Sequence, residues 1–180
     1  AVAFDMIDRG SDAVDHWKAR GIDLSHVLFR PDVPSDVATH CVQPQDHGLE
    51  RALDNQLIEA AMPALEHKQP VNLTAYIRNA DRTVGTMLGS EVTRRHGAAG
   101  LPEDTLRITF TGSAGQSFGA FVPAGMTMKL IGDANDGFGK GLSGGRVIVH
   151  PPLLSAFKSE EYIVIGNDAF YGTTSGEGYG

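Results

Sequence analysis

A glycine-rich stretch in the second half of the chain carries the residue types of two chemical motifs. Gly139-Lys-Gly-Leu-Ser-Gly144 matches G-x-G-x-x-G, in which a helix N-terminus directs backbone N–H groups at the pyrophosphate of a dinucleotide. The residues that follow, Arg146-Val-Ile-Val149, are typical of a strand, so the helix that this mechanism requires is missing. Gly141-Leu-Ser-Gly-Gly145 also matches the G-x-S-x-G nucleophile elbow, but His150 is the only histidine after Ser143. We therefore interpret these glycines as turn residues and predict neither a cofactor site nor a hydrolase nucleophile here.

The stretch Asp133-Ala-Asn-Asp136 resembles a calcium-binding loop, because carboxylate and amide oxygens are calcium ligands. An EF-hand would need glycine where Phe138 stands, and the turns that follow lack the carboxylate series of repeated calcium motifs. Asp133 and Asn135 are expected instead to hydrogen-bond to their own backbone, as these residue types do in turns. An independent catalytic or calcium-binding β-roll is the least favoured function class.

Histidine and cysteine offer no better candidate. Asp46 beside His47 could form an acid–base pair, but a helix N-cap followed by a first-turn histidine is the ordinary arrangement. The histidines include no H-x-x-x-H pair at metal-ligand spacing, and Cys41 has no context that marks a nucleophile, so an inert or buried thiol is expected. The sequence predicts no catalytic, cofactor-binding or metal-binding residue, and whether the chain by itself is an enzyme stays open.

Composition narrows the possible partners. The 180 residues carry a formal net charge of −7, and the densest basic spot is Arg94-Arg-His96, which argues against nucleic acid. No stretch approaches the roughly 18 apolar residues of a membrane span, so no membrane partner is predicted. The single cysteine allows no internal disulfide and favours a cytoplasmic location. Because the chain begins at Ala1 without methionine or a signal peptide, we interpret it as an internal fragment.

The part of the chain before Gly112 holds only seven of the 22 glycines and predicts helices before strands. Residues 1–45 are interpreted as a linker or N-terminal helical arm, with a short helix from Ser11 to Trp17. Apolar side chains then recur at helical spacing over residues 46–69, and Pro63 should kink or end that helix. Residues 46–180 are predicted to form the main domain.

Beyond Pro70 the apolar residues alternate with polar ones, which is typical of strands. The alternation runs from Val71 to Ile77 and restarts at Leu106. A short helix from Ser90 to His96, ended by Gly97, separates these two strands. Helices do not alternate with the later strands at βαβ spacing, which argues against a doubly wound sheet, while a β-sandwich stays open.

The second half of the chain repeats one unit: an apolar strand, a glycine, a short polar stretch, an aromatic residue and another glycine. The aromatic–glycine pairs begin at Phe118, Phe138 and Tyr171, and the interval before the third is longer than the interval between the first two. An excursion over residues 151–161 explains the longer interval. Short strands cannot bury a face alone, but successive copies can stack and hydrogen-bond edge to edge. The repeat therefore predicts a mainly β fold, a parallel β-helix over residues 70–180.

Stacking would align equivalent side chains and explains the glycines. Phe118, Phe138 and Tyr171 are predicted to form one internal column. A second column would contain Ile108 or Phe110, then Leu130 or Ile131, then Val164 or Ile165. Glycine at the corners supplies positive φ, where a Cβ would be strained. The predicted turn glycines are Gly112, Gly119, Gly132, Gly139, Gly141, Gly144, Gly145, Gly166 and Gly172.

Several longer strings are specific enough to compare with a known family. They are Gln45-Asp-His-Gly-Leu-Glu50, Gly100-Leu-Pro-Glu-Asp104, Gly112-Ser-Ala-Gly-Gln-Ser-Phe-Gly-Ala-Phe121, Gly132-Asp-Ala-Asn-Asp136, Gly139-Lys-Gly-Leu-Ser-Gly-Gly145 and Ile165-Gly-Asn167. Together they resemble the C-terminal glycine-rich GXGXG domain of the glutamate synthase large subunit, from about His40 to Gly180. Asp15-His-Trp-Lys18 is similar to the linker that precedes that domain.

The resemblance implies a right-handed, single-stranded parallel β-helix that is incomplete at the C-terminus, since the family's helix continues beyond this point. It implies an enzyme that converts L-glutamine, 2-oxoglutarate and a reductant into two L-glutamates. FMN and an iron–sulfur cluster are implied elsewhere in the subunit, and the β-helix is a non-catalytic part that holds the amidotransferase and FMN domains in place. Those domains are the implied partners, and a reductase small subunit is compatible with the resemblance. An open last turn exposes a strand edge, so we expect the isolated chain to self-associate or to be marginally stable.

A second function class is a stand-alone β-helix subunit. The same β-helix also resembles subunits of the N-methylglutamate synthase and formylmethanofuran dehydrogenase types. The strings over residues 45–50 and 112–121 are more similar to glutamate synthase itself. Glutamate synthase is therefore the leading hypothesis.

Overall fold

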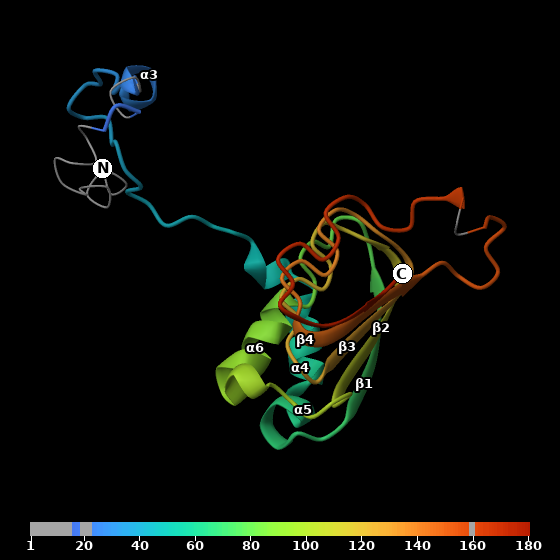
Figure 1. Cartoon of the computed structure of the whole chain (residues 1–180). Helices are drawn as coiled ribbons and strands as arrows, with labels where there is room; N and C mark the ends of the chain where they lie inside the picture. Colours follow the sequence, from blue (N-terminus) through green and yellow to red (C-terminus); the bar gives the residue numbers. More distant parts are fainter. Residues whose placement is uncertain (1–15, 19–22, 159–160) are drawn as a thin grey trace. The chain divides into compact units, whose positions relative to one another are not determined.

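The computed structural model describes residues 16–18, 23–158 and 161–180 (Figure 1). The chain divides into two compact units, Ala1–Asp46 and His47–Gly180. Among the described residues of the first unit, the short helix α3 (Ser25–Leu28) is the only helix or strand, and its side chains are exposed. The helix predicted from Ser11 to Trp17 lies outside the described residues, except for His16 and Trp17.

The second unit is built on a sheet of five parallel strands that lie in chain order. The strands are β1 (Val71–Ile77), β2 (Leu106–Ala114), β3 (Met126–Ala134), β4 (Ser143–His150) and β5 (Ser175–Tyr179). The register between neighbouring strands is regular: Phe110 of β2 pairs with Leu130 of β3, and Leu130 pairs in turn with Val149 of β4. This single parallel sheet differs from the sandwich that the sequence left open.

The interval along the chain lengthens before β5, where Arg146 pairs with Glu177. The described residues between Pro151 and Val164 contain no strand, so the predicted excursion is confirmed. Figure 1 shows this orange loop extending away from the sheet.

The second predicted column is partly wrong. Phe110 and Leu130 pair as expected, but the residue beside Leu130 in β4 is Val149. Ile165 instead makes an isolated bridge with Ala134, the last residue of β3. The reason is that β4 already pairs with residues 127–131 of β3. The chain that returns from the excursion at Ile165 can therefore meet β3 only beyond them, at its last residue.

The helix predicted over residues 46–69 is broken into three pieces. A 3-10 turn, η1 (Leu49–Arg51), precedes α4 (Asp54–Ala60) and α5 (Met62–His67). Pro63 lies in the first turn of α5, where its missing N–H group costs no hydrogen bond, so the predicted break is confirmed. The prediction that Asp46 caps the helix was wrong, because the first helical turn, η1, has Gly48 at its N-cap and α4 begins only at Asp54.

Helix α6 (Thr86–His96) begins four residues before the predicted Ser90 and ends at Gly97 as predicted. The buried carboxylate of Asp54 accepts hydrogen bonds from the N–H groups of Gly85 (3.0 and 3.1 Å) and Leu88 (3.1 Å). These N–H groups have no partner within the helix, so a side chain from α4 caps α6. A cap so distant along the chain cannot be found from the residues next to the helix. A 3-10 turn, η2 (Gly97–Ala99), follows α6.

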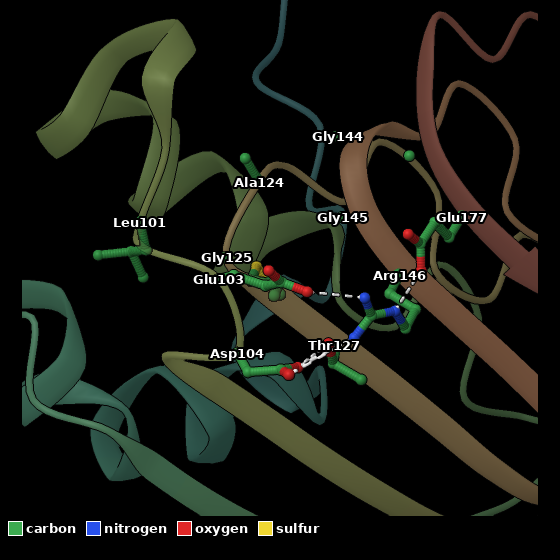
Figure 2. Close-up of a pocket in the computed structure, with 12 residues that line it drawn as sticks. Leu101, Glu103, Asp104, Ala124, Gly125, Thr127, Gly144, Gly145, Arg146 and Glu177 are labelled. Carbon is green, nitrogen blue, oxygen red and sulfur yellow. Dashed lines mark hydrogen bonds and ion pairs between the residues drawn. The ribbon is translucent and has the colours of Figure 1, made fainter.

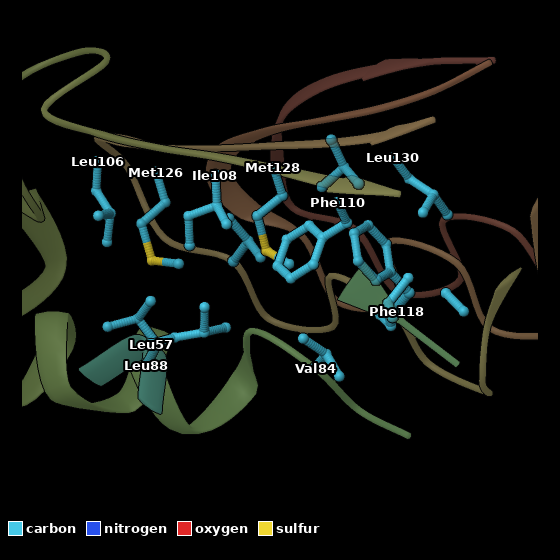
Figure 3. Close-up of a cluster of buried hydrophobic side chains, with 14 of the residues drawn as sticks. Leu57, Val84, Leu88, Leu106, Ile108, Phe110, Phe118, Met126, Met128 and Leu130 are labelled. Atoms are coloured by element: carbon cyan, nitrogen blue, oxygen red, sulfur yellow. The ribbon is translucent and has the colours of Figure 1, made fainter. Parts of the chain in front are cut away.

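The core lies between one face of the sheet and the helices (Figure 3). Leu57 of α4 and Leu88 of α6 lie opposite the side chains of β2 and β3. The alternating side chains of those strands are fully buried: Leu106, Ile108, Phe110, Met126, Met128 and Leu130. The period-two pattern therefore sets which face of each strand is buried.

Aromatic rings continue the core beyond the helices. The buried rings of Phe118 and Phe138 stack with centroids 6.0 Å apart and planes 14° from parallel. The third ring in contact is Phe170, 5.5 Å from Phe138, whereas Tyr171 is 73% exposed. The prediction of Tyr171 was wrong by one residue, because Phe170 has a positive φ of 59° and points inward in its place.

Backbone hydrogen bonds join successive turns as well as successive strands. The N–H of Gly139 donates to the carbonyl of Phe118, and the N–H of Phe170 donates to that of Phe138.

Gly112 and Gly132, two of the predicted turn glycines, lie inside β2 and β3 rather than in the turns after them. Gly145 and Gly166 do not have positive φ; their position is explained by close contacts, since a Cβ there would lie within 3 Å of neighbouring backbone atoms. The other seven predicted glycines have positive φ.

Candidate functional site

A charged cavity of about 410 Å³ lies at the amino ends of β3, β4 and β5 (Figure 2). Its lining combines backbone from Gly125, Gly144 and Gly145 with side chains that carry charge. Because glycine leaves the backbone uncovered, the strand ends can approach closely there. The charged side chains come from the segment before β2 and from β4 and β5: Glu103, Asp104, Arg146 and Glu177.

Arg146 is the centre of this cluster. Its Nε lies 2.6 Å from Glu177 Oε2, its Nη2 lies 2.8 Å from Glu103 Oε1, and its Nη1 lies 3.4 Å from Asp104 Oδ1. Figure 2 shows the guanidinium between these three carboxylates. The five donors of a guanidinium suit such a fork of several acceptors. The pKa of Arg146 is raised by its hydrogen bonds to Glu177 and Glu103.

Asp104 links the same arginine to two more strands. It accepts hydrogen bonds from Arg107 Nη2 (2.6 Å) and Thr127 Oγ1 (2.7 Å). These bonds, with that of Arg107 the larger, hold the pKa of Asp104 down to about 2. The pKa of Glu177 is likewise lowered, first by its hydrogen bond with Arg146. These carboxylates therefore stay ionised near pH 7 and are poorly suited to general acid–base catalysis, which needs a pKa near the working pH.

The cluster follows the register of the sheet. Arg107, Thr127, Arg146 and Glu177 pair in turn across β2, β3, β4 and β5, on the face opposite the core. This row was not predicted, although its first three members follow the same spacing as the buried positions of those strands. Asp104 offered no such signal, because it precedes β2 and has a positive φ of 55°. The arrangement ties strands together and presents no reactive pair.

The glycines of the 139–145 stretch form a turn whose N–H groups are already used. A strand, β4, follows them as predicted, and the N–H groups of residues 139–143 and 145 all donate to backbone carbonyls. Ser143 Oγ donates to the carbonyl of Gly141 (2.7 Å). Ser143 and His150 are the two ends of β4, which places them about 23 Å apart at the usual rise per residue. They cannot form a nucleophile–base pair.

The 133–136 stretch makes bonds that were not predicted. Asp133 Oδ1 accepts from Ser113 Oγ (2.7 Å), and Asn135 Nδ2 donates to Asn79 Oδ1. Asp136 Oδ1 accepts from the N–H of Asn167 (2.7 Å). The expected bonds of Asp133 and Asn135 to their own backbone were wrong. Parallel stacking instead places Ser113 of β2 beside Asp133 of β3, and Asn79 beside Asn135.

The remaining candidates lie apart. Cys41 is exposed, and its Sγ donates to the carbonyl of Gln43 (3.0 Å). Among residues 16–18, 23–158 and 161–180, no three His, Cys, Asp or Glu side chains gather as a metal site would require. The longest described helix, α6, has 11 residues against the ~20 of a membrane span, and no described helix is long and apolar enough to cross a membrane.

The parallel sheet, its glycine-bearing strands and its row of ion pairs define a glycine-rich repeat domain, and comparison with known proteins agrees. The family model of the GXGXG motif matches residues 54–180, so the chain belongs to the GXGXG family. It is 46% identical over 176 residues to the glutamate synthase [NADPH] large chain of Bacillus subtilis, covering 97% of this chain and 11% of that protein.

Two further relatives carry different names. The chain is 48% identical over 167 residues to glutamate synthase [NADH] of Saccharomyces cerevisiae, covering 90% of this chain and 8% of the yeast protein. It is 34% identical over 184 residues to ferredoxin-dependent glutamate synthase 2, chloroplastic, of Arabidopsis thaliana, covering 97% and 11%. The resemblance to the glutamate synthase large subunit is thus confirmed, and the chain spans about a tenth of the length of these relatives.

Proposed function

We propose that the chain is the first part of a right-handed parallel β-helix in a glutamate synthase large subunit. Strands that follow one another in chain order, at the nearly equal spacing that takes Phe110 to Leu130 and then to Val149, are what a stack of β-helix turns requires. Right-handed connections are the strong preference between parallel strands of one sheet. The observation that carries the proposal is this register, together with the hydrogen bonds between turns at Phe118, Phe138 and Phe170.

The role that we propose is non-catalytic: the domain holds the amidotransferase and FMN domains of the same subunit in place. A rigid stack suits that role, because its core is continuous and Arg146 ties β4, β5 and the segment before β2 together. The relatives are named for three reductants, NADPH, NADH and ferredoxin, yet all share this segment. A segment common to all three is better suited to a task that does not depend on the reductant.

The cofactors that the resemblance implies do not fit this chain. An iron–sulfur cluster is held by several thiolates, and the chain has one cysteine, Cys41. The turn at residues 139–145, which alone resembles a nucleotide-binding loop, uses its N–H groups for backbone bonds. We therefore propose that FMN and the cluster belong to other domains. The single cysteine also fits a reducing compartment, and we propose that this compartment is the cytoplasm.

Two measurements test the proposal. The purified 180-residue chain should release no ammonia from glutamine and show no flavin absorbance after incubation with FMN. The protein encoded by the complete reading frame should convert glutamine and 2-oxoglutarate to glutamate. Glutaminase turnover by the chain alone would overturn the non-catalytic role. A complete reading frame without amidotransferase and FMN domains would overturn the assignment to glutamate synthase and favour a stand-alone subunit.

A further inference from the structure

The loop after β4 presents two adjacent leucines to solvent. Residues 152–155 form a turn closed by a hydrogen bond from the N–H of Ser155 to the carbonyl of Pro152 (2.9 Å). Leu153 and Leu154 are the two central residues of this turn, and their exposed fractions are 96% and 98%. Single exposed apolar residues are ordinary, but turns favour Gly, Asn, Asp and Ser. Two almost fully exposed leucines at the tip of a turn therefore need an explanation.

Side-chain contacts within the loop lie away from its tip. The rings of Phe157 and Tyr162 lie with centroids 4.8 Å apart, and Lys158 Nζ lies 3.3 Å from Glu161 Oε1. Phe157 also lines a cavity of about 320 Å³ with Ile131, on the outer face of the sheet. Neither Leu153 nor Leu154 belongs to the buried core or packs against it. The loop thus holds the two leucines outward.

The stack itself does not need the loop. The shorter connection between β3 and β4, which pairs Leu130 with Val149, suffices for parallel pairing, whereas the connection that pairs Arg146 with Glu177 is longer. The extra residues contain the turn and contribute no strand among those described. A segment that is dispensable for pairing and exposes apolar side chains is better explained by contact with another surface.

We propose that Leu153 and Leu154 dock into an apolar cleft on another domain of the same polypeptide, and this rests on the proposed function. The chain covers 8% to 11% of its relatives, so most of such a subunit lies outside it. Two leucines form a contact far below the ~1,000 Å² that a stable interface between separate proteins needs. Within one polypeptide the effective concentration reaches about millimolar, so a small contact suffices. Residues 151–157 carry no charge, which fits an apolar cleft rather than a charged surface.

Cysteine labelling at the turn tests this proposal. Leu153→Cys is introduced, with Cys41→Ser, into the 180-residue chain and into the full-length subunit, and maleimide labelling at residue 153 is followed by peptide mass spectrometry. Labelling should be about tenfold slower or more in the full-length subunit, as for a docked state favoured at least ten to one. Unfolding in urea should restore the rate, which shows that the thiol is intact.

A paired substitution separates docking from folding. Leu153→Ser with Leu154→Ser should leave the melting temperature of the 180-residue chain unchanged and make the full-length subunit more sensitive to limited proteolysis between domains. Val27→Ser, which alters an exposed apolar residue of the first unit, is the matched control and should change neither.

Three results would overturn the docking proposal. Equal labelling rates in both proteins would show that no domain covers the turn, and glutamine-dependent glutamate synthesis by the same full-length protein would still test the proposed function independently. Slow labelling of the chain alone, with a dimer in sedimentation that the double-serine variant does not form, would assign the leucines to a second copy, because self-association through the open strand edge does not depend on them. Binding of the chain to phosphatidylcholine vesicles, lost in the double-serine variant, would assign them to a lipid surface.

Discussion

Gly132 lies directly beside Gly112 in the register of β2 and β3, and a Cβ on Gly132 would overlap the carbonyl oxygen of Gly112. The same relationship recurs one strand earlier, where a Cβ on Gly112 would overlap the carbonyl oxygen of Ile77. The φ angles of Gly112 and Gly132, 133° and 153°, also disfavour any other residue. Successive strands can therefore approach this closely only because both positions lack a side chain.

Gly132→Ala should destabilise the second unit strongly. The methyl group would meet backbone that cannot move without breaking the pairing of β2 and β3, and we expect a loss of about 3 kcal/mol or more in the free energy of unfolding. Gly172→Ala is the control: its φ is 67°, but no atom lies within 4 Å of the added Cβ, so the expected loss is about 1 to 2 kcal/mol. Urea unfolding followed by circular dichroism measures both; equal losses would contradict the role of close approach.

Asp54→Ala should remove the cap of α6. Two buried N–H groups, of Gly85 and Leu88, would lose their acceptor, and we expect a loss of about 2 to 4 kcal/mol. Glu59→Ala, at an exposed position of the same helix α4, should change stability by less than about 0.5 kcal/mol. Burial raises the pKa of Asp54 above 3.8, so the carboxyl stabilises most below that pH and the cost of removal should shrink as pH rises. An unchanged helix content and stability at pH 3.8 or just below, where the expected cost is largest, would contradict the cap.

Asp104→Asn should change stability in a pH-dependent way. The pKa of Asp104 is lowered from 3.8 to about 2 in the folded protein, so its contribution is fully present above pH 3.8 and lost as pH falls toward 2. The difference in melting temperature between wild type and Asp104→Asn should therefore be largest near neutral pH and vanish between about pH 4 and pH 2. Because these charges lie near the surface, raising the salt concentration should also reduce it. A difference that persists unchanged at pH 2 would show that the carboxylate charge is irrelevant.

Phe170→Ala and Tyr171→Ala should differ in how much they destabilise the protein. Phe170 packs against the core and against the ring of Phe138, so its truncation should cost about 2 to 3 kcal/mol. Tyr171 is 73% exposed, and its truncation should cost less than about 0.5 kcal/mol. Thermal melting of the two variants side by side is the measurement. A larger effect of Tyr171→Ala would restore the original prediction.

Positions that follow from local pattern were predictable, and those that depend on a distant partner were not. The strand from Val71 to Ile77 is confirmed with its bounds, because alternation records which face is buried. The start of α6 was missed, because its cap, Asp54, lies 31 positions from Gly85 in sequence. The choice of Phe170 over Tyr171 was missed, because the positive φ of Phe170 directs its own ring toward the core and leaves Tyr171 exposed. In the charged cluster, the repeat contained Arg107, Thr127 and Arg146 at matching positions, but nothing in the sequence places Asp104 between them.

By itself the sequence determined the repeat: apolar alternation, the spacing of Phe118 and Phe138, and the glycines that permit close strands, because each depends on the local stereochemistry of a few residues. Only the tertiary structure decided which side chains contact one another. The three carboxylates around Arg146 belong to Glu103, Asp104 and Glu177, which lie 43, 42 and 31 positions from it in sequence. Only the parallel stacking of strands brings these side chains within hydrogen-bonding distance of Arg146. Loop length is almost free to vary in a stacked fold, so sequence distance carries little information about which residues meet.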